Sequence, residues 1–355
     1  MKSAKLDIRR FNGFGIIVDD LNIDFRPQAV GWQLALNSQQ LKGQITERDA
    51  NQPTRVHLTQ LHLPKTLSAE HGQDALADFD MRSIPALDIQ IDALYQNSSD
   101  LGAWSLNTRP QAQGVLFDKL NLSLKGLQVT GQLGWEHGKG KMQSWYKGRL
   151  AGDNLKDVLL AWDFAPSITS RSFRADANVR WAGSPAAFDM ARLSGDLDIN
   201  FQKGQMVTID GSAQALRVFG LLNFDSIGRR LRLDFSDLLD KGLAYDRFKG
   251  KLQVVNGIYR THKTLNLEGP SSNLELEGQL DLVKEQINAK LQVALPITNN
   301  LPLAAIAIGA PAIGGALFVV DRLIGDRLAR FASVTYHISG DWQHPDISLT
   351  KKTSE

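Results

Sequence analysis

Residues 273–295 read NLELEGQLDLVKEQINAKLQVAL, and this stretch decides the fold class. Apolar and polar residues alternate with period two from Leu274 to Leu282, and again from Ile287 to Leu295. Such alternation is typical of β-strands that bury one face. Lys284-Glu-Gln286 separates the two runs and is short enough for a hairpin connection. We therefore predict two antiparallel strands, each with one apolar and one polar face.

The first run also contains a motif that recurs along the chain: a large apolar residue, a polar residue, a glycine, a polar residue and a large apolar residue. Period two places each glycine on the apolar face, between its two apolar neighbours. A glycine inside a strand marks a bend or a close approach, so its repetition predicts a sheet that curls around the apolar face. The spacings are unequal, which excludes a fixed-period solenoid. The seven motifs are centred on Gly43, Gly131, Gly148, Gly195, Gly250, Gly278 and Gly340.

The same alternation extends outward in both directions. It is clear over residues 21–25, 87–93 and 173–181. Asn256-Gly257 lies between two alternating runs and is a strong signal for a hairpin turn. These patterns favour half-buried antiparallel strands over helices.

Helical periodicity is confined to short segments. After Asp153, a predicted N-cap, apolar residues recur at three- and four-residue steps from Leu155 to Trp162, and Pro166 ends the pattern. A second short helix is predicted over residues 213–224. Both are expected to be accessory to the sheet.

Residues 301–320 carry no charge over twenty positions. We predict two short helices with a hinge, because Gly309-Ala-Pro311 and Gly314-Gly315 interrupt a single span. A helical stripe continues through Leu317, Val320, Ile324, Leu328 and Phe331. This segment could close the end of the sheet's apolar face or insert into a membrane surface, and a transmembrane span fits its interruptions poorly.

Composition excludes several functions. The chain has 355 residues, a formal net charge of +2 and no long run of one charge, which excludes a nucleic-acid surface. It has no cysteine, so disulfides and thiolate metal sites are excluded. His57 and His62 point to opposite faces of a strand, and acid pairs such as Asp196/Asp198 fall on a polar face. We therefore assign no catalytic residue, no metal site and no cofactor.

The amino end shows no secretory signal. Met1-Lys-Ser-Ala-Lys5 lacks an apolar core, and strand alternation has begun by Leu6. We expect the chain to be the downstream piece of something longer.

A long sheet with one apolar face must have that face covered. It can fold into a sandwich, close as a barrel, or form an open trough whose floor is covered by another molecule. Acyl chains suit a trough, because each buried methylene contributes ~0.8 kcal/mol and needs no directional contact.

Several segments resemble the C-terminal region of the AsmA-like family. They are residues 219–235, Gly242 to Gly250, and Tyr336-His-Ile-Ser-Gly340-Asp-Trp342-Gln-His-Pro345-Asp-Ile347. Trp181-Ala-Gly-Ser-Pro185 and residues 301–320 are most similar to the YhdP branch of that family. The resemblance implies a periplasmic, membrane-associated, non-enzymatic protein whose repeating β-groove carries phospholipid between inner and outer membranes and supports the outer-membrane barrier. The family's N-terminal inner-membrane anchor and most of its groove have no counterpart here, so a missing anchor region or a partner chain is expected.

The predicted fold is therefore mainly β: a long, curved antiparallel sheet forming a U-shaped open trough, with a few short helices and an apolar helical hairpin near the C-terminus. Residues 1–165 form a first groove segment ending in the short helix, and residues 166–298 form the AsmA-like groove segment. Residues 299–332 form the apolar helical segment. Residues 333–355 form a closing strand and a polar tail.

Two sets of candidate site residues follow, chosen by alternation and by position. The predicted partners are phospholipid acyl chains for the first set and the inner leaflet of the outer membrane, through residues 301–331, for the second. The groove candidates are Leu197, Ile199, Leu252, Val254, Leu274, Leu276, Leu280, Leu282, Ile287, Leu291 and Val293. The membrane-contact candidates are Leu303, Ile306, Ile308, Ile313, Leu317 and Phe318. The competing hypothesis is a structural scaffold of the bacterial envelope, a closed β-sandwich that binds no lipid.

Overall fold

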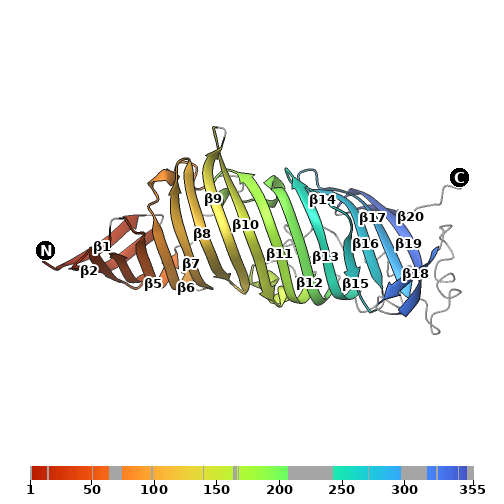
Figure 1. Cartoon of the computed structure of the whole chain (residues 1–355), viewed down its shortest axis with the longest axis horizontal. Helices are drawn as coiled ribbons and strands as arrows, with labels where there is room; N and C mark the ends of the chain where they lie inside the picture. The colour runs from red at the N-terminus through yellow and green to blue at the C-terminus, as the bar shows by residue number, and fades with distance from the viewer. Residues whose placement is uncertain are drawn as a thin grey trace. The chain divides into compact units, whose positions relative to one another are not determined.

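The computed structural model describes residues 2–13, 16–49, 51–63, 74–96, 99–138, 140–162, 166, 168–206, 243–270, 272–296, 318–324, 327–342 and 344–349. Within these ranges the chain is mainly β, as predicted, and its strands belong to one hydrogen-bonded sheet (Figure 1). The α-helix of the described part is α1 (Leu155–Ala161). No helix among the residues so described is long and apolar enough to cross a membrane.

Most strands pair with the next strand along the chain. The first ten are β1 (Ala4–Gly13), β2 (Ile16–Pro27), β3 (Trp32–Asn37), β4 (Leu41–Glu47), β5 (Thr54–Leu63), β6 (Leu87–Gln96), β7 (Ser99–Gln111), β8 (Gly114–Leu124), β9 (Leu127–Gly138) and β10 (Lys141–Asp153). The others are β11 (Ile168–Ala182), β12 (Ser194–Met206), β13 (Leu243–Val255), β14 (Ile258–Thr261), β15 (Leu265–Glu268), β16 (Asn273–Asp281), β17 (Gln286–Pro296), β18 (Phe318–Ile324), β19 (Arg327–Asp341) and β20 (Asp346–Leu349). Further pairs join β13 to β15, β14 to β16 and β17 to β19.

The chain forms two compact units. Unit 1 comprises Met1–Leu150 and Ala177–Asp189, and unit 2 comprises Ala151–Asp176 and Met190–Glu355. The predicted boundaries at residues 165, 298 and 332 stay predictions.

Both predicted hairpins are confirmed. In the quoted stretch, β16 pairs with β17 so that Leu280 faces Ile287 and Leu276 faces Leu291. At the other turn, Val255 faces Ile258. Asn256 and Gly257 have φ of 47° and 77°, the left-handed values that a two-residue hairpin turn requires.

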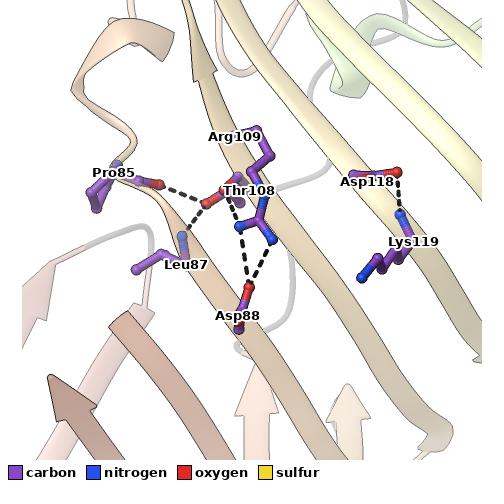
Figure 2. A network of polar contacts seen from close by, with 7 residues as sticks. All are labelled: Pro85, Leu87, Asp88, Thr108, Arg109, Asp118 and Lys119. Atoms are coloured by element: carbon purple, nitrogen blue, oxygen red, sulfur yellow. Dashed lines mark hydrogen bonds and ion pairs between the residues drawn. The ribbon is translucent and has the colours of Figure 1, made fainter. Parts of the chain in front are cut away.

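One pairing departs from the antiparallel pattern, because β5 and β6 run parallel. Parallel neighbours need a crossover connection, and its described part, residues 74–86, includes the 3-10 helix η1 (Met81–Ser83). Figure 2 shows how the crossover ends: the buried Thr108 hydroxyl donates to Pro85 O at 2.6 Å and accepts from Leu87 N at 2.9 Å. Beside it, Arg109 makes two 3.1 Å hydrogen bonds to Asp88 Oδ1. This network fixes the start of β6.

In unit 1, strands β2 to β7 share one apolar core. Ile23 faces Leu36, which faces Gly43 on the next strand. The buried members of this cluster are Val18, Leu21, Leu36, Leu41, Leu58, Ile91, Leu94 and Leu101. The register of neighbouring strands thus aligns apolar positions within this part of the unit.

The apolar positions change parity inside the first hairpin, which simple alternation did not predict. Ile8 and Phe11 are three residues apart, yet both pack against the same core, as do Leu21 and Val18 opposite them. Asp20 lies at this point with φ of 49°. A left-handed residue rotates the strand locally, so apolar side chains on either side of it reach one face.

At two of the motif glycines, Gly278 and Gly131, the backbone of the neighbouring strand approaches closely. Gly278 faces Ala289 in the register and has φ of 158°. A Cβ built there would lie 2.4 Å from Ala289 Cα, and one on Gly131 would lie 2.5 Å from Gly148 Cα. No side chain fits between strand backbones at these distances, so glycine is required at both positions.

The predicted short helix is confirmed as α1, with its apolar residues Leu155, Val158 and Leu159 buried. The predicted cap is wrong by one residue: Asn154, not Asp153, is the N-cap, with φ of 55°. The helix predicted over residues 213–224 lies outside the described residues.

The predicted helical stripe is wrong over residues 318–331. Phe318–Ile324 is strand β18, which pairs antiparallel with β19 from Arg327 to Ser333. Short apolar runs are ambiguous between helix and strand, and Val319, Val320 and Ile324 are β-branched residues that favour strands. The rest of the predicted helical segment, 299–317, lies outside the described residues.

Candidate functional site

The candidate site is the apolar face of unit 2, defined by two rows of residues that face one another across neighbouring strands. Gly195, Val254 and Tyr259 form the start of one row, which continues through Leu280, Ile287 and Gly340. The other row contains Phe201, Phe248, Leu267, Leu274, Val293 and Val334. The rows cross from β12 to β19, so residues far apart in sequence share one apolar surface.

β14 and β15 together occupy the position of one strand between β13 and β16, with a break between them. Residues 258–261 pair with one end of both neighbours and residues 265–268 with the other. At the interruption, the Thr261 hydroxyl accepts a 3.0 Å hydrogen bond from Gly278 N. This side chain replaces a missing backbone partner and keeps the register of the face across the gap.

Ten of the eleven groove candidates lie in strands on this face. Val254, Leu274, Leu280, Ile287, Leu291 and Val293 are buried, with exposures of 8% or less. Leu197, Ile199, Leu252 and Leu276 are half-buried. The eleventh, Leu282, lies in the turn after β16, where its N–H donates to Gly257 O at 3.0 Å.

The four half-buried candidates lie on three strands of the face, β12, β13 and β16. Leu197 faces Leu252 on the neighbouring strand, and Leu276 faces Leu265. We call Leu197, Ile199, Leu252 and Leu276 the open strip. Apolar side chains that keep solvent contact on an ordered sheet are a surface on which further apolar groups can bind.

Simple alternation missed part of this face. Tyr259, Leu265 and Leu267 line it from β14 and β15, and Tyr336 and Ile338 line it from β19. Tyr336 and Ile338 are 1% and 0% exposed. Their alternation with His337 and Ser339 is visible in the sequence and could have identified them.

The opposite face is polar and solvated. Lys251 Nζ lies 3.4 Å from Asp198 Oδ2, and Lys249 Nζ lies 3.2 Å from Glu268 Oε1. These exposed cross-strand pairs give Asp198 and Glu268 solvated partners, and each contributes little to stability.

An aromatic cluster occupies the end of the apolar face near Met206. Phe201 packs edge to face against Phe173 and Phe248, with centroids 6.1 and 5.8 Å apart. Tyr245 is 2% exposed, and its hydroxyl donates to Thr169 O at 2.6 Å. Burial raises the pKa of Tyr245 to about 12, which outweighs the opposing effect of a hydrogen bond with Ser170. Tyr245 is therefore neutral at physiological pH.

His57 and His62, the two histidines of β5, each contact a neighbouring side chain. His57 Nε2 lies 2.9 Å from Asp92 Oδ2, and His62 stacks on Tyr95 with ring centroids 4.6 Å apart. The described residues contain no group of three or more His, Asp or Glu side chains placed to hold a metal ion. Of the membrane-contact candidates, Phe318 begins β18, while Leu303, Ile306, Ile308, Ile313 and Leu317 lie outside the described residues.

The model of the family described as YhdP protein matches residues 2–347. A relative from Escherichia coli (strain K12), named intermembrane phospholipid transporter YhdP, is 26% identical over 221 residues. That alignment covers 62% of this chain and 17% of the relative's length. No solved structure matches the chain.

Proposed function

Because the chain belongs to the YhdP family, we propose that its apolar face lines part of a path for phospholipid between the two membranes of a bacterial envelope. In this proposal acyl chains lie on the face and head groups remain in water at its margin. The chain supplies a passive surface and performs no chemistry. Its location is the periplasm.

The open strip is the observation that most directly supports the proposal. Four large apolar side chains on β12, β13 and β16 retain solvent contact on a face whose other positions are apolar in register. An acyl chain would remove this surface from water, with ~0.8 kcal/mol gained for each buried methylene. The face offers acyl chains no directional partner, which suits cargo that must bind and move on.

The relative's name supports the same cargo, since it states intermembrane phospholipid transport for a protein of the same family. The rival scaffold role would leave the apolar face closed against protein alone. It rests on the buried candidates, such as Val293 at 2% exposure, which need no further cover. The two roles therefore differ in what contacts the open strip.

Site-specific photocrosslinking in cells tests the proposal. A benzoylphenylalanine in place of Leu276 lies on the open strip, and one in place of Glu277 lies on the polar face of the same strand. We expect phospholipid adducts, identified by intact mass, at position 276 and none at position 277. Protein adducts alone at position 276, with no phospholipid, would favour the scaffold.

A further inference from the structure

A second apolar surface of the molecule is covered by the chain itself. In unit 1, Val115 faces Trp135 and Phe117 faces Leu133 on β8 and β9. Residues 74–86, which we call the cover segment, lie against this surface. Met81 of the cover is 1% exposed and packs with Val115 and Trp135, and Leu76 and Ile84 pack around them.

The cover contacts the sheet through side chains that resemble acyl chains in shape and polarity. Leu76, Met81 and Ile84 are flexible or aliphatic, and Phe79 stacks on Trp135 with ring centroids 5.9 Å apart. Phe79 is itself 37% exposed. The segment's own hydrogen bonds, such as Phe79 N to Leu76 O and Ile84 N to Met81 O, are local. The middle of the cover is thus held on the sheet by apolar contact.

Polar contacts hold the cover at its two ends. At one end, Asp74 accepts hydrogen bonds from Ser184 N at 2.8 Å and from the Ser184 hydroxyl. At the other, Pro85 O accepts from Thr108, as in Figure 2. Burial raises the pKa of Asp74, but hydrogen bonds from Ser184 and Leu76 N outweigh it and hold this pKa below its usual value. Asp74 is therefore ionised at neutral pH, and we call its hydrogen bonds with Ser184 the latch.

The latch explains a motif that the apolar face of unit 2 leaves unassigned. Ser184 belongs to Trp181-Ala-Gly-Ser-Pro185 and is fully buried. Trp181 Nε1 donates to Ser184 O at 2.9 Å, and Ser144 donates to Gly183 O at 2.9 Å. A Cβ on Gly183, whose φ is 96°, would lie 2.9 Å from Asp74 Oδ2. The motif thus presents a rigid donor pair and leaves room for one carboxylate.

The surface under the cover contains an unused hydrogen-bond donor. Trp135 is 2% exposed, and its Nε1 has no hydrogen-bond partner in the structure. Buried N–H groups without an acceptor are rare, because each loses its hydrogen bond to water and gains none. The cover segment therefore buries the apolar surface but offers no acceptor to the indole N–H of Trp135.

We propose that the surface beneath the cover segment is a phospholipid subsite, in which Trp135 donates its indole N–H to an ester carbonyl and the cover is an alternative occupant. Acyl chains take the places of Met81, Leu76 and Ile84 against Val115 and Phe117. The Asp74–Ser184 latch sets the balance between closed and lipid-bound forms. The inference rests on the proposed function and extends it to unit 1.

The test uses benzoylphenylalanine in place of Phe117 and reads phospholipid adducts by intact mass in the full chain. Asp74→Asn weakens the latch, and we expect it to raise the adduct yield at position 117 several-fold. Asp78→Asn, an exposed site in the same segment, is the control and leaves the yield unchanged. An equal yield in both variants would overturn the latch.

Trp135→Phe keeps an aromatic ring and removes the N–H. We expect phospholipid adducts at position 117 to fall about five-fold, the equivalent of a net hydrogen bond of ~1 kcal/mol. Trp104→Phe is the matched control, because Trp104 Nε1 already donates to Ser123 O at 3.1 Å. We expect Trp104→Phe to lower the unfolding temperature and to leave the phospholipid adducts unchanged. Trp135→Phe removes no hydrogen bond of the lipid-free chain, so we expect no loss of unfolding temperature from that cause.

The subsite and the general function fail differently. If position 276 yields phospholipid adducts but position 117 yields none even with Asp74→Asn, or if Trp135→Phe behaves as the parent chain, the subsite is wrong and the path in unit 2 stands. If neither position yields phospholipid in any variant, the proposed function itself is wrong.

Discussion

At the scale of single residues, glycine is the clearest link from sequence to structure. The recurring motif correctly placed glycines on the apolar face, because period two is visible in one sequence. Their physical reason was not visible: Gly278 and Gly131 admit no Cβ because the neighbouring backbone lies within 2.5 Å of where it would be. The distance to the neighbouring backbone depends on how the strands pair, which one sequence does not show. A motif can thus be recognised before its cause is known.

Gly278→Ala should lower the free energy of unfolding by about 2–4 kcal/mol, because its Cβ overlaps Ala289 Cα and the backbone must move. Gly140→Ala is the control. Gly140 has φ of 75° but nothing within 4 Å of a built Cβ, so it reports backbone strain alone, about 1 kcal/mol. Denaturant unfolding measures both. Equal losses would mean that steric overlap at Gly278 is unimportant.

Tyr245 predicts a specific dependence of stability on pH. Its pKa is raised from 10.0 to about 12 in the folded chain, so its contribution is complete below pH 10 and is lost as pH rises toward 12. Tyr245→Phe should remove this alkaline loss and cost about 1 kcal/mol at neutral pH through the hydrogen bond to Thr169 O. Unfolding curves from pH 8 to 12 measure both effects. An unchanged alkaline slope would contradict the assignment.

At the scale of elements, predictions succeeded where local pattern determines structure. Alternation and Asn256-Gly257 identified the β13–β14 hairpin, and the hairpin in the quoted stretch has the predicted register. The parallel β5–β6 pair was missed, because a crossover depends on contacts made 20 or more residues away, such as Thr108 to Pro85. Residues 318–331 were misread because short apolar runs suit both helices and strands.

The β13–β14 turn provides a test at this scale. Asn256→Val should lower the free energy of unfolding by about 1–2 kcal/mol, because a β-branched residue tolerates φ of 47° poorly. Asn256→Gly should change it by only a few tenths of a kcal/mol. Thermal unfolding of the two variants distinguishes them. If valine and glycine are equivalent, the turn does not constrain the hairpin.

At the scale of the whole molecule, each unit carries an apolar face, and the two faces differ in what covers them. Alternation alone selected ten positions that lie in strands on the face of unit 2, where their neighbours are in register, and their contact with lipid stays a prediction. It could not separate the open strip from the buried positions, since exposure depends on packing from other strands. Nor could it find the cover over Trp135, which a distant segment supplies. The function that we propose for the chain depends on this difference in exposure and cover between the two faces.

The central claim is that the open strip binds phospholipid, and native mass spectrometry of the gently purified chain tests it most directly. We expect mass additions equal to phospholipids in the parent chain. Leu252→Asp places a charge on the open strip and should lower the amount of bound phospholipid several-fold while the chain stays folded by circular dichroism. Gln253→Asp places the same charge on the polar face, beside Asp196 and Arg260, and should retain the mass additions. A parent chain that carries no phospholipid, or variants that carry equal amounts, would contradict the account.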